Sequence, residues 1–249
     1  MPAVLVHGNP ETAAIWGPLI DALDRSDVIT LSPPGFGAPV PDGWGATRAE
    51  YVAWLIGELE AIGEPVDLVG HDWGGGHVAA VAMTRPNLLR SWCVDVMGLF
   101  HPDYVWHDMA QVWQADGAGE EAVAAMIAPP LAERAAGFEG LGMPPEVALS
   151  VAEATNENMA RCILALYRDA AQPAVREAGE AVPAAAARPG LVIVARDDPY
   201  VGTEEMAREM AERCDATVVA LDGVGHWWML QQPAVGAAAL QGFWTGLGA

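Results

Sequence analysis

The chain has 249 residues, of which 52% are hydrophobic, and its 33 acidic residues outnumber 12 basic ones to give a formal charge of −21. That apolar content can fill a sizeable core, which excludes a disordered or fibrous protein. The negative charge disfavours nucleic acid, anionic membrane surfaces and strongly anionic substrates as partners.

Short apolar runs alternate with helical patterns along most of the chain. Strands are predicted at residues 3–6, 28–31, 66–69, 92–96, 191–195 and 217–221. Helices are predicted at residues 13–23, 48–62, 76–83, 204–213 and 233–244. Near-continuous apolar strands separated by helices are typical of an α/β protein with a parallel sheet covered on both faces.

The alternation stops between about Gly98 and Arg188, where no convincing strand is found. Helical stretches are predicted there at residues 104–113, 120–126 and 145–170, and an Ala- and Pro-rich linker at 177–189. An all-helical insertion between two strands of a parallel sheet predicts a lid. We therefore expect a core domain in two parts, residues 1–98 and 189–249, with a helical cap at 99–188.

The cysteines and histidines indicate the cellular compartment and whether a metal is expected. Cys93, Cys162 and Cys214 are an odd number at wide spacing, which predicts free thiols in a reducing compartment. The opening stretch MPAVLVHGNP has the pattern of neither a signal peptide nor a membrane span. None of the six histidines stands at metal-ligand spacing from Cys or Glu. We expect a cytoplasmic protein without membrane association, metal or other cofactor.

The stretch GHDWGGG at residues 70–76 directly follows a predicted strand and precedes a helical pattern. A strand, a turn of small residues and a helix present the nucleophile of α/β hydrolases in the pattern G-x-S-x-G, but the central residue here is Asp72. The simpler interpretation is that Asp72 caps the following helix.

Two further motifs favour catalysis. His226 lies in a Gly-rich loop after the last predicted strand, and Asp198 in an acidic turn after the strand before it. Nucleophile, acid and base then follow one another along the chain, each at the carboxyl end of a strand, where open α/β sheets place their sites. Asp95, inside an apolar strand, is a buried charge that needs a partner, and it is either an alternative acid that orients His226 or a hydrogen-bonded structural group.

These motifs, with HGNP at residues 7–10, resemble the α/β-hydrolase superfamily, and within it the haloalkane dehalogenases and epoxide hydrolases with an aspartate nucleophile. The resemblance extends over essentially the whole chain. The family usually carries two more strands before the HGxP loop, and this chain begins almost at that loop. We therefore expect the same fold, a mostly parallel sheet flanked by helices with an inserted helical lid, but without those two strands.

A carboxylate suits attack on a saturated carbon, because it is already ionised at neutral pH and forms an alkyl ester with the enzyme. His226, oriented by Asp198, is then expected to activate the water that hydrolyses the ester. The backbone N–H groups of Asn9 and Trp73 are the candidate oxyanion hole. The expected substrate is small, neutral and apolar.

The leaving group separates the two activities. The side chains of Asn9 and Trp73 resemble the halide-binding pair of one set of dehalogenases, which favours dehalogenation. Epoxide hydrolases instead place two lid tyrosines over the nucleophile. Tyr167 resembles the second of them, whereas Tyr104 is an imperfect match for the first because Met109 stands about where it is expected. A non-catalytic receptor on the same scaffold is a third, less favoured alternative.

Overall fold

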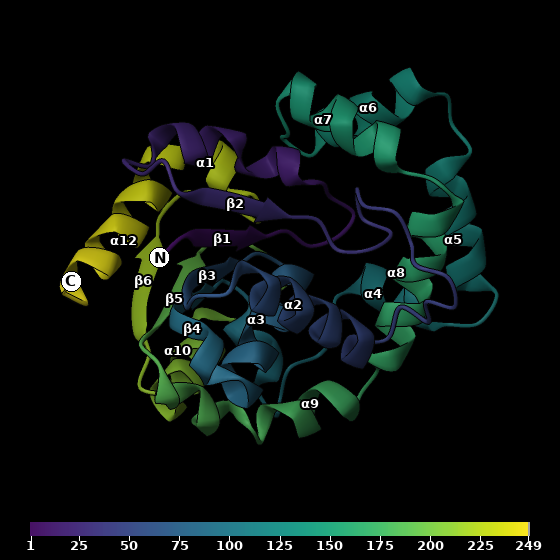
Figure 1. Cartoon of the computed structure of the whole chain (residues 1–249). Coiled ribbons are helices and arrows are strands. Elements are labelled where there is room, and N and C mark those ends of the chain that lie inside the picture. Colours follow the sequence, from purple (N-terminus) through teal and green to yellow (C-terminus); the bar gives the residue numbers. More distant parts are fainter. Residues whose placement is uncertain (249) are drawn as a thin grey trace.

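A six-stranded parallel sheet forms the centre of the computed structural model, which describes residues 1–248 (Figure 1). The strand order is β2-β1-β3-β4-β5-β6, and every neighbouring pair is parallel. The strands are β1 (Ala3–Val6), β2 (Val28–Leu31), β3 (Val66–Gly70), β4 (Leu89–Val94), β5 (Gly190–Ala195) and β6 (Thr217–Leu221). The predicted α/β-hydrolase fold is confirmed, and the first strand is the one that leads into the HGNP loop.

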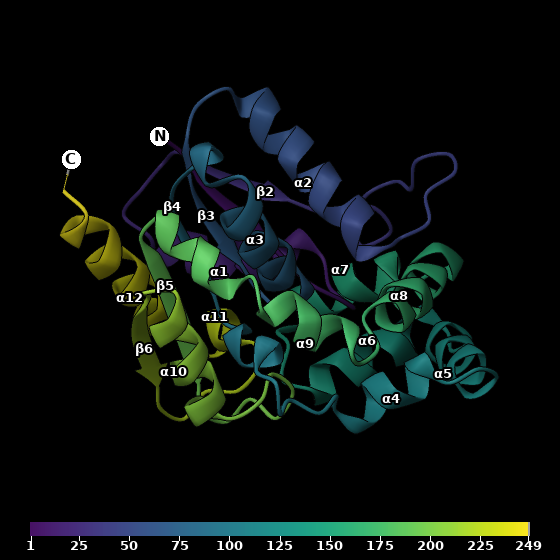
Figure 2. The same ribbon diagram turned by 90° about the horizontal axis from the view of Figure 1, so that it is seen from below.

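Helices cover both faces of the sheet because successive residues of each strand point to opposite sides. Ala3 and Leu5 of β1 belong to one hydrophobic cluster with residues of η1 (Ala13–Trp16), α1 (Gly17–Ala22), α11 (Trp228–Gln231) and α12 (Pro233–Gly246). Val4 and Val6 belong to the other, with residues of α2 (Arg48–Ile62), α3 (Trp73–Thr84) and α10 (Glu204–Arg213). Figure 2 shows α2, α3 and α10 gathered on one side of the sheet.

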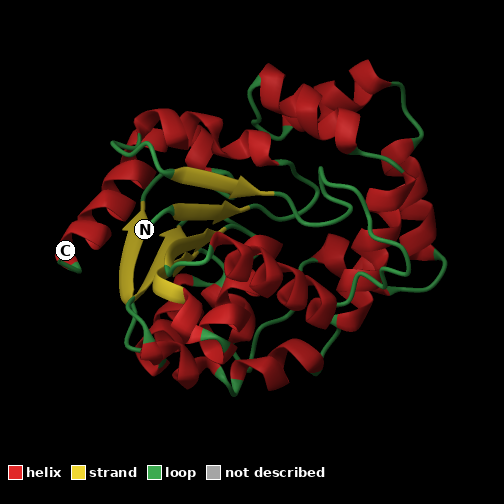
Figure 3. Ribbon diagram, in the orientation of Figure 1, coloured by secondary structure: helices red, strands yellow, loops and turns green. Residues whose placement is uncertain are grey.

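Between β4 and β5, all regular secondary structure in the described residues is helical. It comprises η3 (Met97–Phe100), α4 (Asp108–Gln114), α5 (Ala118–Ile127), α6 (Leu131–Gly140), α7 (Pro145–Ala154), α8 (Glu157–Asp169), α9 (Ala174–Gly179) and η4 (Val182–Ala187). The arrows of β1 and β2 point toward α4, α5 and α8 (Figure 3). The helical segment therefore lies at the carboxyl ends of the strands. The candidate residues Asp72, Asp198 and His226 follow the carboxyl ends of β3, β5 and β6.

Several predicted boundaries differ from the observed ones. The stretch at 145–170 is two helices, because the Asn156 side chain accepts hydrogen bonds from the N–H groups of Asn158 and Met159 and caps α8. Helix α6 was not predicted, and the expected linker at 177–189 contains the end of α9 and the short η4. Strand β4 begins three residues before its predicted start at Trp92.

A buried acidic group stabilises the amino-terminal side of the sheet. Asp67 of β3 is fully buried and forms ion pairs with Arg25, at 2.9 Å, and with Arg90, at 2.8 Å. The hydroxyl of Ser91 donates to the same carboxylate at 2.6 Å. This carboxylate is fully paired, in contrast to that of Asp72, described below.

Among the helices of residues 1–248, none has the length and apolar character needed to span a bilayer.

Candidate active site

Asp72 sits at the tip of a sharp turn between β3 and α3. Its backbone has φ 49° and ψ −127°, a left-handed conformation that is strained for a residue with a side chain. The turn closes only because its neighbours are small: a Cβ on Gly74 would collide with the carbonyl oxygen of Val6, and one on Gly8 with the Asp72 carboxylate. The Asp72 side chain makes no capping hydrogen bond to α3. Asp72 thus stands at the N-cap position of α3, but helix capping does not account for its carboxylate.

The structure brings the three predicted catalytic side chains together. Asp198 lies in the turn after β5, and its Oδ2 lies 2.8 Å from Nδ1 of His226, in the loop after β6. On the other side of the ring, Nε2 of His226 is 3.8 Å from Oδ2 of Asp72. With the Nδ1 proton donated to Asp198, Nε2 is left to face the Asp72 carboxylate. The imidazole can thus accept a proton from a water placed between it and Asp72.

Burial and mutual charge shift both titrating groups at this site. Burial raises the pKa of Asp72 to about 6, and the nearby His226 only partly offsets that effect. Burial also opposes a charge on His226, as does His71, but the hydrogen bond that His226 donates to Asp198 and the carboxylates of Asp198 and Asp72 outweigh them and raise the pKa of His226. Two neighbouring titratable groups whose pKa values are both displaced are typical of catalytic sites.

Asn9 contacts Asp72 through its backbone and not through its side chain. The Asn9 N–H donates to Oδ1 of Asp72 at 2.9 Å. The side chain is 4% exposed, and within residues 1–248 neither its amide nitrogen nor its oxygen has a hydrogen-bond partner. Buried amides are normally satisfied, so an unpartnered one beside a nucleophile suits a ligand.

Trp73 is the first residue of α3, so its N–H lies at the helix N-terminus beside Asp72. Its indole stacks on Trp106, with ring centroids 5.8 Å apart, and meets Tyr167 edge-on at 5.3 Å. Trp73 lines two small cavities next to Asp72 rather than the main one described below.

Asp95 does not contact His226. Its carboxylate instead accepts from Nδ1 of His71 at 2.5 Å, from the Asp72 N–H at 3.1 Å and from the Trp228 indole at 2.7 Å. These bonds occupy both oxygens of Asp95, whereas Asp198 is the carboxylate that contacts the ring of His226. The contacts favour the second interpretation of Asp95, a hydrogen-bonded structural group.

A cavity of about 330 Å³ opens beside Asp72 and His226. This volume suits a small organic molecule. Most of its lining is apolar, and most of that comes from the helical segment. The lining residues are Asn9, Pro10, Asp72, His107, Met109, Trp113, Met126, Phe138, Leu141, Tyr167, Tyr200, His226 and Trp227. Leu166, next to Tyr167 on α8, is fully buried in the core.

Tyr167, on α8 of the helical segment, is one of two hydrogen-bond donors that line this cavity. Burial raises the pKa of Tyr167 well above its ordinary value, so its hydroxyl keeps its proton. Tyr104 is different, because its hydroxyl donates to the carbonyl of Tyr200 at 2.7 Å and, among the described residues, it does not line the cavity. The Tyr104 hydroxyl is thus engaged with the backbone, unlike that of Tyr167.

His107 is the donor that sequence reasoning missed. Its Nδ1 accepts the N–H of Ala110 at 3.2 Å and caps α4, which places the proton of the neutral ring on Nε2. Burial lowers the pKa of His107, with the charge of His226 acting in the same sense. The signal in the sequence is a histidine directly before an acidic first helical turn at Asp108.

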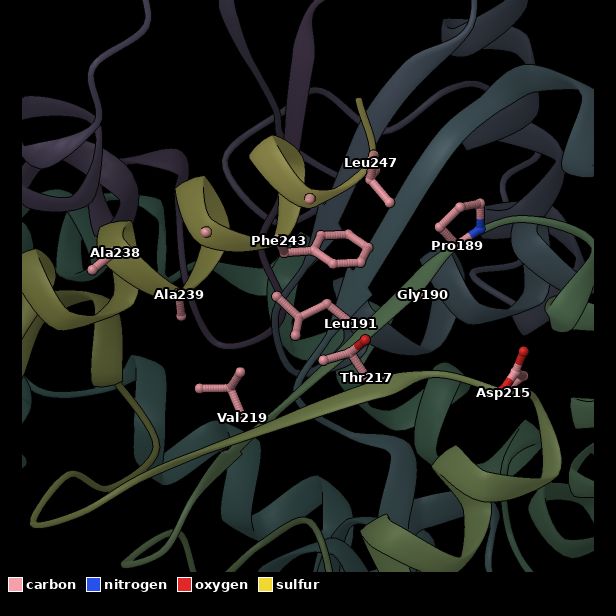
Figure 4. A pocket seen from close by; sticks show the side chains of 12 residues that line it. Pro189, Gly190, Leu191, Asp215, Thr217, Val219, Ala238, Ala239, Phe243 and Leu247 are labelled. Carbon is pink, nitrogen blue, oxygen red and sulfur yellow. The ribbon is translucent and has the colours of Figure 1, made fainter. Parts of the chain in front are cut away.

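A second hollow, of about 530 Å³, lies between α12 and the edge formed by β5 and β6. Figure 4 shows Phe243, Leu191 and Val219 on its walls, with Asp215 at one end. Asp215 is the one ionisable group among the described residues that line it. Without a nucleophile paired to a base, this hollow is not the candidate active site.

Glu11, His71 and His226 each place one potential metal-ligand atom within 4.8 Å of the others. However, Nε2 of His71 already lies 3.0 Å from Oε1 of Glu11, and Nδ1 of His226 is bonded to Asp198. A metal ion here would displace hydrogen bonds that the buried groups make with one another.

Comparison with known proteins agrees with this architecture. The sequence model of the alpha/beta hydrolase family matches residues 3–239. The chain belongs to the alpha/beta hydrolase family. Among solved structures, this hydrolase superposes on haloalkane dehalogenase DbeA from Bradyrhizobium elkani with a TM-score of 0.76 and 22% identity, covering 99% of this chain and 90% of that one. It also superposes on E-2-(acetamidomethylene)succinate hydrolase with a TM-score of 0.72 and 19% identity, covering 98% and 91%.

Two curated relatives match part of this hydrolase. The (E)-2-((N-methylformamido)methylene)succinate hydrolase of Acinetobacter baylyi is 33% identical over 37% of this chain and 36% of its own length. An epoxide hydrolase of Caballeronia sordidicola is 31% identical over 41% of this chain and 31% of its own length. The aligned part is thus about a third of each relative.

Proposed function

We propose that this alpha/beta hydrolase acts at a saturated carbon through an alkyl ester on Asp72. The supporting observation is a carboxylate at the tip of the strained turn, 3.8 Å from a histidine that is itself bonded to Asp198. A carboxylate oxygen displaces a leaving group without first losing a proton, whereas a serine in this turn would need His226 for that step.

The reaction has two steps. In the first, one oxygen of Asp72 bonds to the substrate carbon, and the leaving group departs with the electron pair of the broken bond. In the second, water attacks the ester carbonyl of Asp72 while Nε2 of His226 takes its proton. The N–H groups of Asn9 and Trp73 stabilise the oxyanion that forms. The bond between the Asp72 carbonyl carbon and the alkoxide oxygen then breaks, and the departing oxygen takes the proton held by His226 to give the alcohol. The carboxyl group of Asp72 loses its remaining proton to solvent, which restores the carboxylate.

The first candidate for the leaving group is a halide. Departing halide gains negative charge and needs donors that are already in place. The buried, unpartnered amide of Asn9 next to Asp72 is the observation that favours it, and Trp73, directly after Asp72, lines two small cavities together with Asp72. We propose hydrolytic dehalogenation of small haloalkanes as the activity.

The second candidate is an epoxide, whose ring oxygen stays on the product and needs a hydrogen bond as it gains charge. Tyr167 and His107 both line the cavity above Asp72, and each has a donor free for this oxygen. These two donors favour opening of an epoxide to a vicinal diol by the same Asp72 and His226.

The cavity also limits what binds. Its walls are mostly apolar, and the chain carries a formal charge of −21, so we propose a neutral, apolar substrate. Because residues of α4, α5, α6 and α8 line the cavity, we propose that residues 99–188 act as its lid.

A parallel assay separates the candidates. Purified protein is incubated with a panel of bromoalkanes and a panel of terminal epoxides, and bromide and diol are measured, with Asp72→Asn as the inactive control. Bromide release without diol supports dehalogenation, and diol without bromide supports the epoxide candidate. If neither product exceeds that of the control across both panels, the proposal of attack at a saturated carbon is wrong.

A further inference from the structure

Three ionisable side chains form a buried cluster behind the catalytic residues. His71 is fully buried and lies between two carboxylates, with Nε2 3.0 Å from Glu11 and Nδ1 2.5 Å from Asp95. Glu11 is fully buried too, and Asp95 is 6% exposed. The catalytic scheme proposed above uses none of the three directly.

Both carboxylates make the same set of contacts. Each accepts one N–H from the His71 ring, one indole N–H from the loop that carries His226, and one backbone N–H from another catalytic loop. Glu11 accepts the indole N–H of Trp227 at 2.5 Å and the backbone N–H of Gly8 at 3.0 Å. Asp95 accepts the indole N–H of Trp228 at 2.7 Å and the backbone N–H of Asp72 at 3.1 Å.

The contacts join the three segments on which the chemistry depends. Gly8 precedes Asn9, Asp72 is the nucleophile itself, and the two tryptophans directly follow His226. A shift of about 1 Å between nucleophile, oxyanion donors and base is enough to slow catalysis on the order of a hundredfold.

We propose that Glu11, His71 and Asp95 are positioning residues, in which a doubly protonated His71 joins two carboxylates that hold the Asn9 loop, the nucleophile and the base loop in register. Only a ring with protons on both nitrogens donates to both carboxylates at once. This inference rests on the proposed function, because the register matters for the two steps described there.

The electrostatics of the cluster agree with the geometry. Burial opposes a charge on His71, but Glu11 and Asp95 outweigh it and raise the pKa of His71 well above its ordinary value. Other titratable groups also act on this region: Asp72, His7 and His226 all interact with His71, and the ring of His226 is 4.5 Å away.

The test compares Glu11→Gln with wild type and with Glu60→Gln, a surface carboxylate paired with Arg85. The rates of ester formation on Asp72 and of ester hydrolysis are measured separately by rapid quench and mass spectrometry. Glutamine keeps the shape of Glu11 but cannot accept from three donors. We expect Glu11→Gln to slow hydrolysis about a hundredfold and ester formation less, because hydrolysis alone needs the base loop.

A second readout follows the protons of His71 directly. In ¹⁵N NMR of the wild type, both ring nitrogens of His71 should carry protons from pH 6 to 9, whereas in Glu11→Gln the ring should titrate within that range. This readout tests whether the bridging ring is doubly protonated, whereas the difference between the two rates tests whether the bridge positions the catalytic loops. If Glu11→Gln does not fold, Trp227→Phe removes one tether and leaves the charges unchanged. It should slow hydrolysis more than formation, with the His71 titration as in wild type.

Two results overturn the inference: a wild-type His71 with one protonated nitrogen at pH 7, or a folded Glu11→Gln that hydrolyses the ester at the wild-type rate. Equal slowing of both steps in Trp227→Phe counts against it as well. Failure of the proposed function is distinct, because then no wild-type adduct forms. The inference is then decided by the NMR titration and by amide exchange at Gly8, which should be faster in Glu11→Gln than in Glu60→Gln.

Discussion

Replacing the nucleophile with its isosteric amide should make the protein more stable. In the folded chain Asp72 lies largely buried, and burial raises its pKa from an ordinary 3.8 to about 6. At about 1.4 kcal/mol for each pKa unit, ionising Asp72 in the folded protein costs about 3 kcal/mol more than ionising it in the unfolded chain. The side-chain amide in the variant Asp72→Asn is never charged, and its oxygen still accepts the N–H of Asn9, so that cost is removed.

The sign and the pH window follow from the direction of the pKa change. Below about pH 4 the carboxyl is protonated in both states, so wild type and Asp72→Asn should be about equally stable. Between pH 4 and pH 6 only the unfolded chain ionises, and wild type loses stability relative to the variant. Above pH 6 the full difference of about 3 kcal/mol applies, which corresponds to about 6 to 12 °C in Tm for a chain of this size.

Urea unfolding followed by circular dichroism at a series of pH values measures the difference. Asp67→Asn is the matched control, because that carboxylate is buried but paired with Arg25 and Arg90. Removing its charge should destabilise the protein by about 3 to 5 kcal/mol, the opposite sign. If Asp72→Asn is no more stable than wild type at pH 8, or if the gap does not close toward pH 4, the reasoning about a strained, desolvated nucleophile is refuted.

Three further outcomes are expected. The rate of ester formation should rise with pH and reach half its maximum near pH 6, because Asp72 must be ionised; hydrolysis should reach half-maximum above pH 6.5, because His226 must be neutral and its pKa is raised. A stopped-flow pH series in which hydrolysis reaches half its maximal rate at a lower pH than ester formation would contradict this. Asn9→Ala should slow ester formation from bromoalkanes about a hundredfold through loss of one leaving-group donor, and an unchanged single-turnover rate would remove Asn9 from that role. Tyr167→Phe and His107→Phe should each slow epoxide opening about a hundredfold, and unaffected diol formation in both variants would exclude the epoxide candidate's two donors.

The sheet was predictable because its signal is local. Each strand is a short apolar run, and five of the six predicted strands lie within one residue of the observed bounds. The helical segment was harder. The break between α7 and α8 depends on one capping side chain, Asn156, inside an otherwise continuous helical pattern. Helix α6 is short, and Ala135 and Phe138 are its only apolar side chains buried among the described residues, so its pattern is weak.

The candidate site divides in the same way. Asp72, Asp198 and His226 were predictable because each ends a strand of one parallel sheet, and the topology brings those ends together. The pairing of Glu11 with His71 joins side chains 60 positions apart that belong to different loops, and composition carries no sign of it. The choice between Asp198 and Asp95 likewise depended on which carboxylate faces the ring of His226 in space.

The central claim is that Asp72 becomes covalently bonded to the substrate. In His226→Phe the first step remains possible, whereas the second lacks its base, so the ester should accumulate. After incubation with an accepted bromoalkane or epoxide, intact-protein mass spectrometry should find a shift equal to the substrate residue, and peptide mapping should place it on Asp72. A variant that keeps its native mass with every substrate that the wild type converts would contradict covalent catalysis by this aspartate.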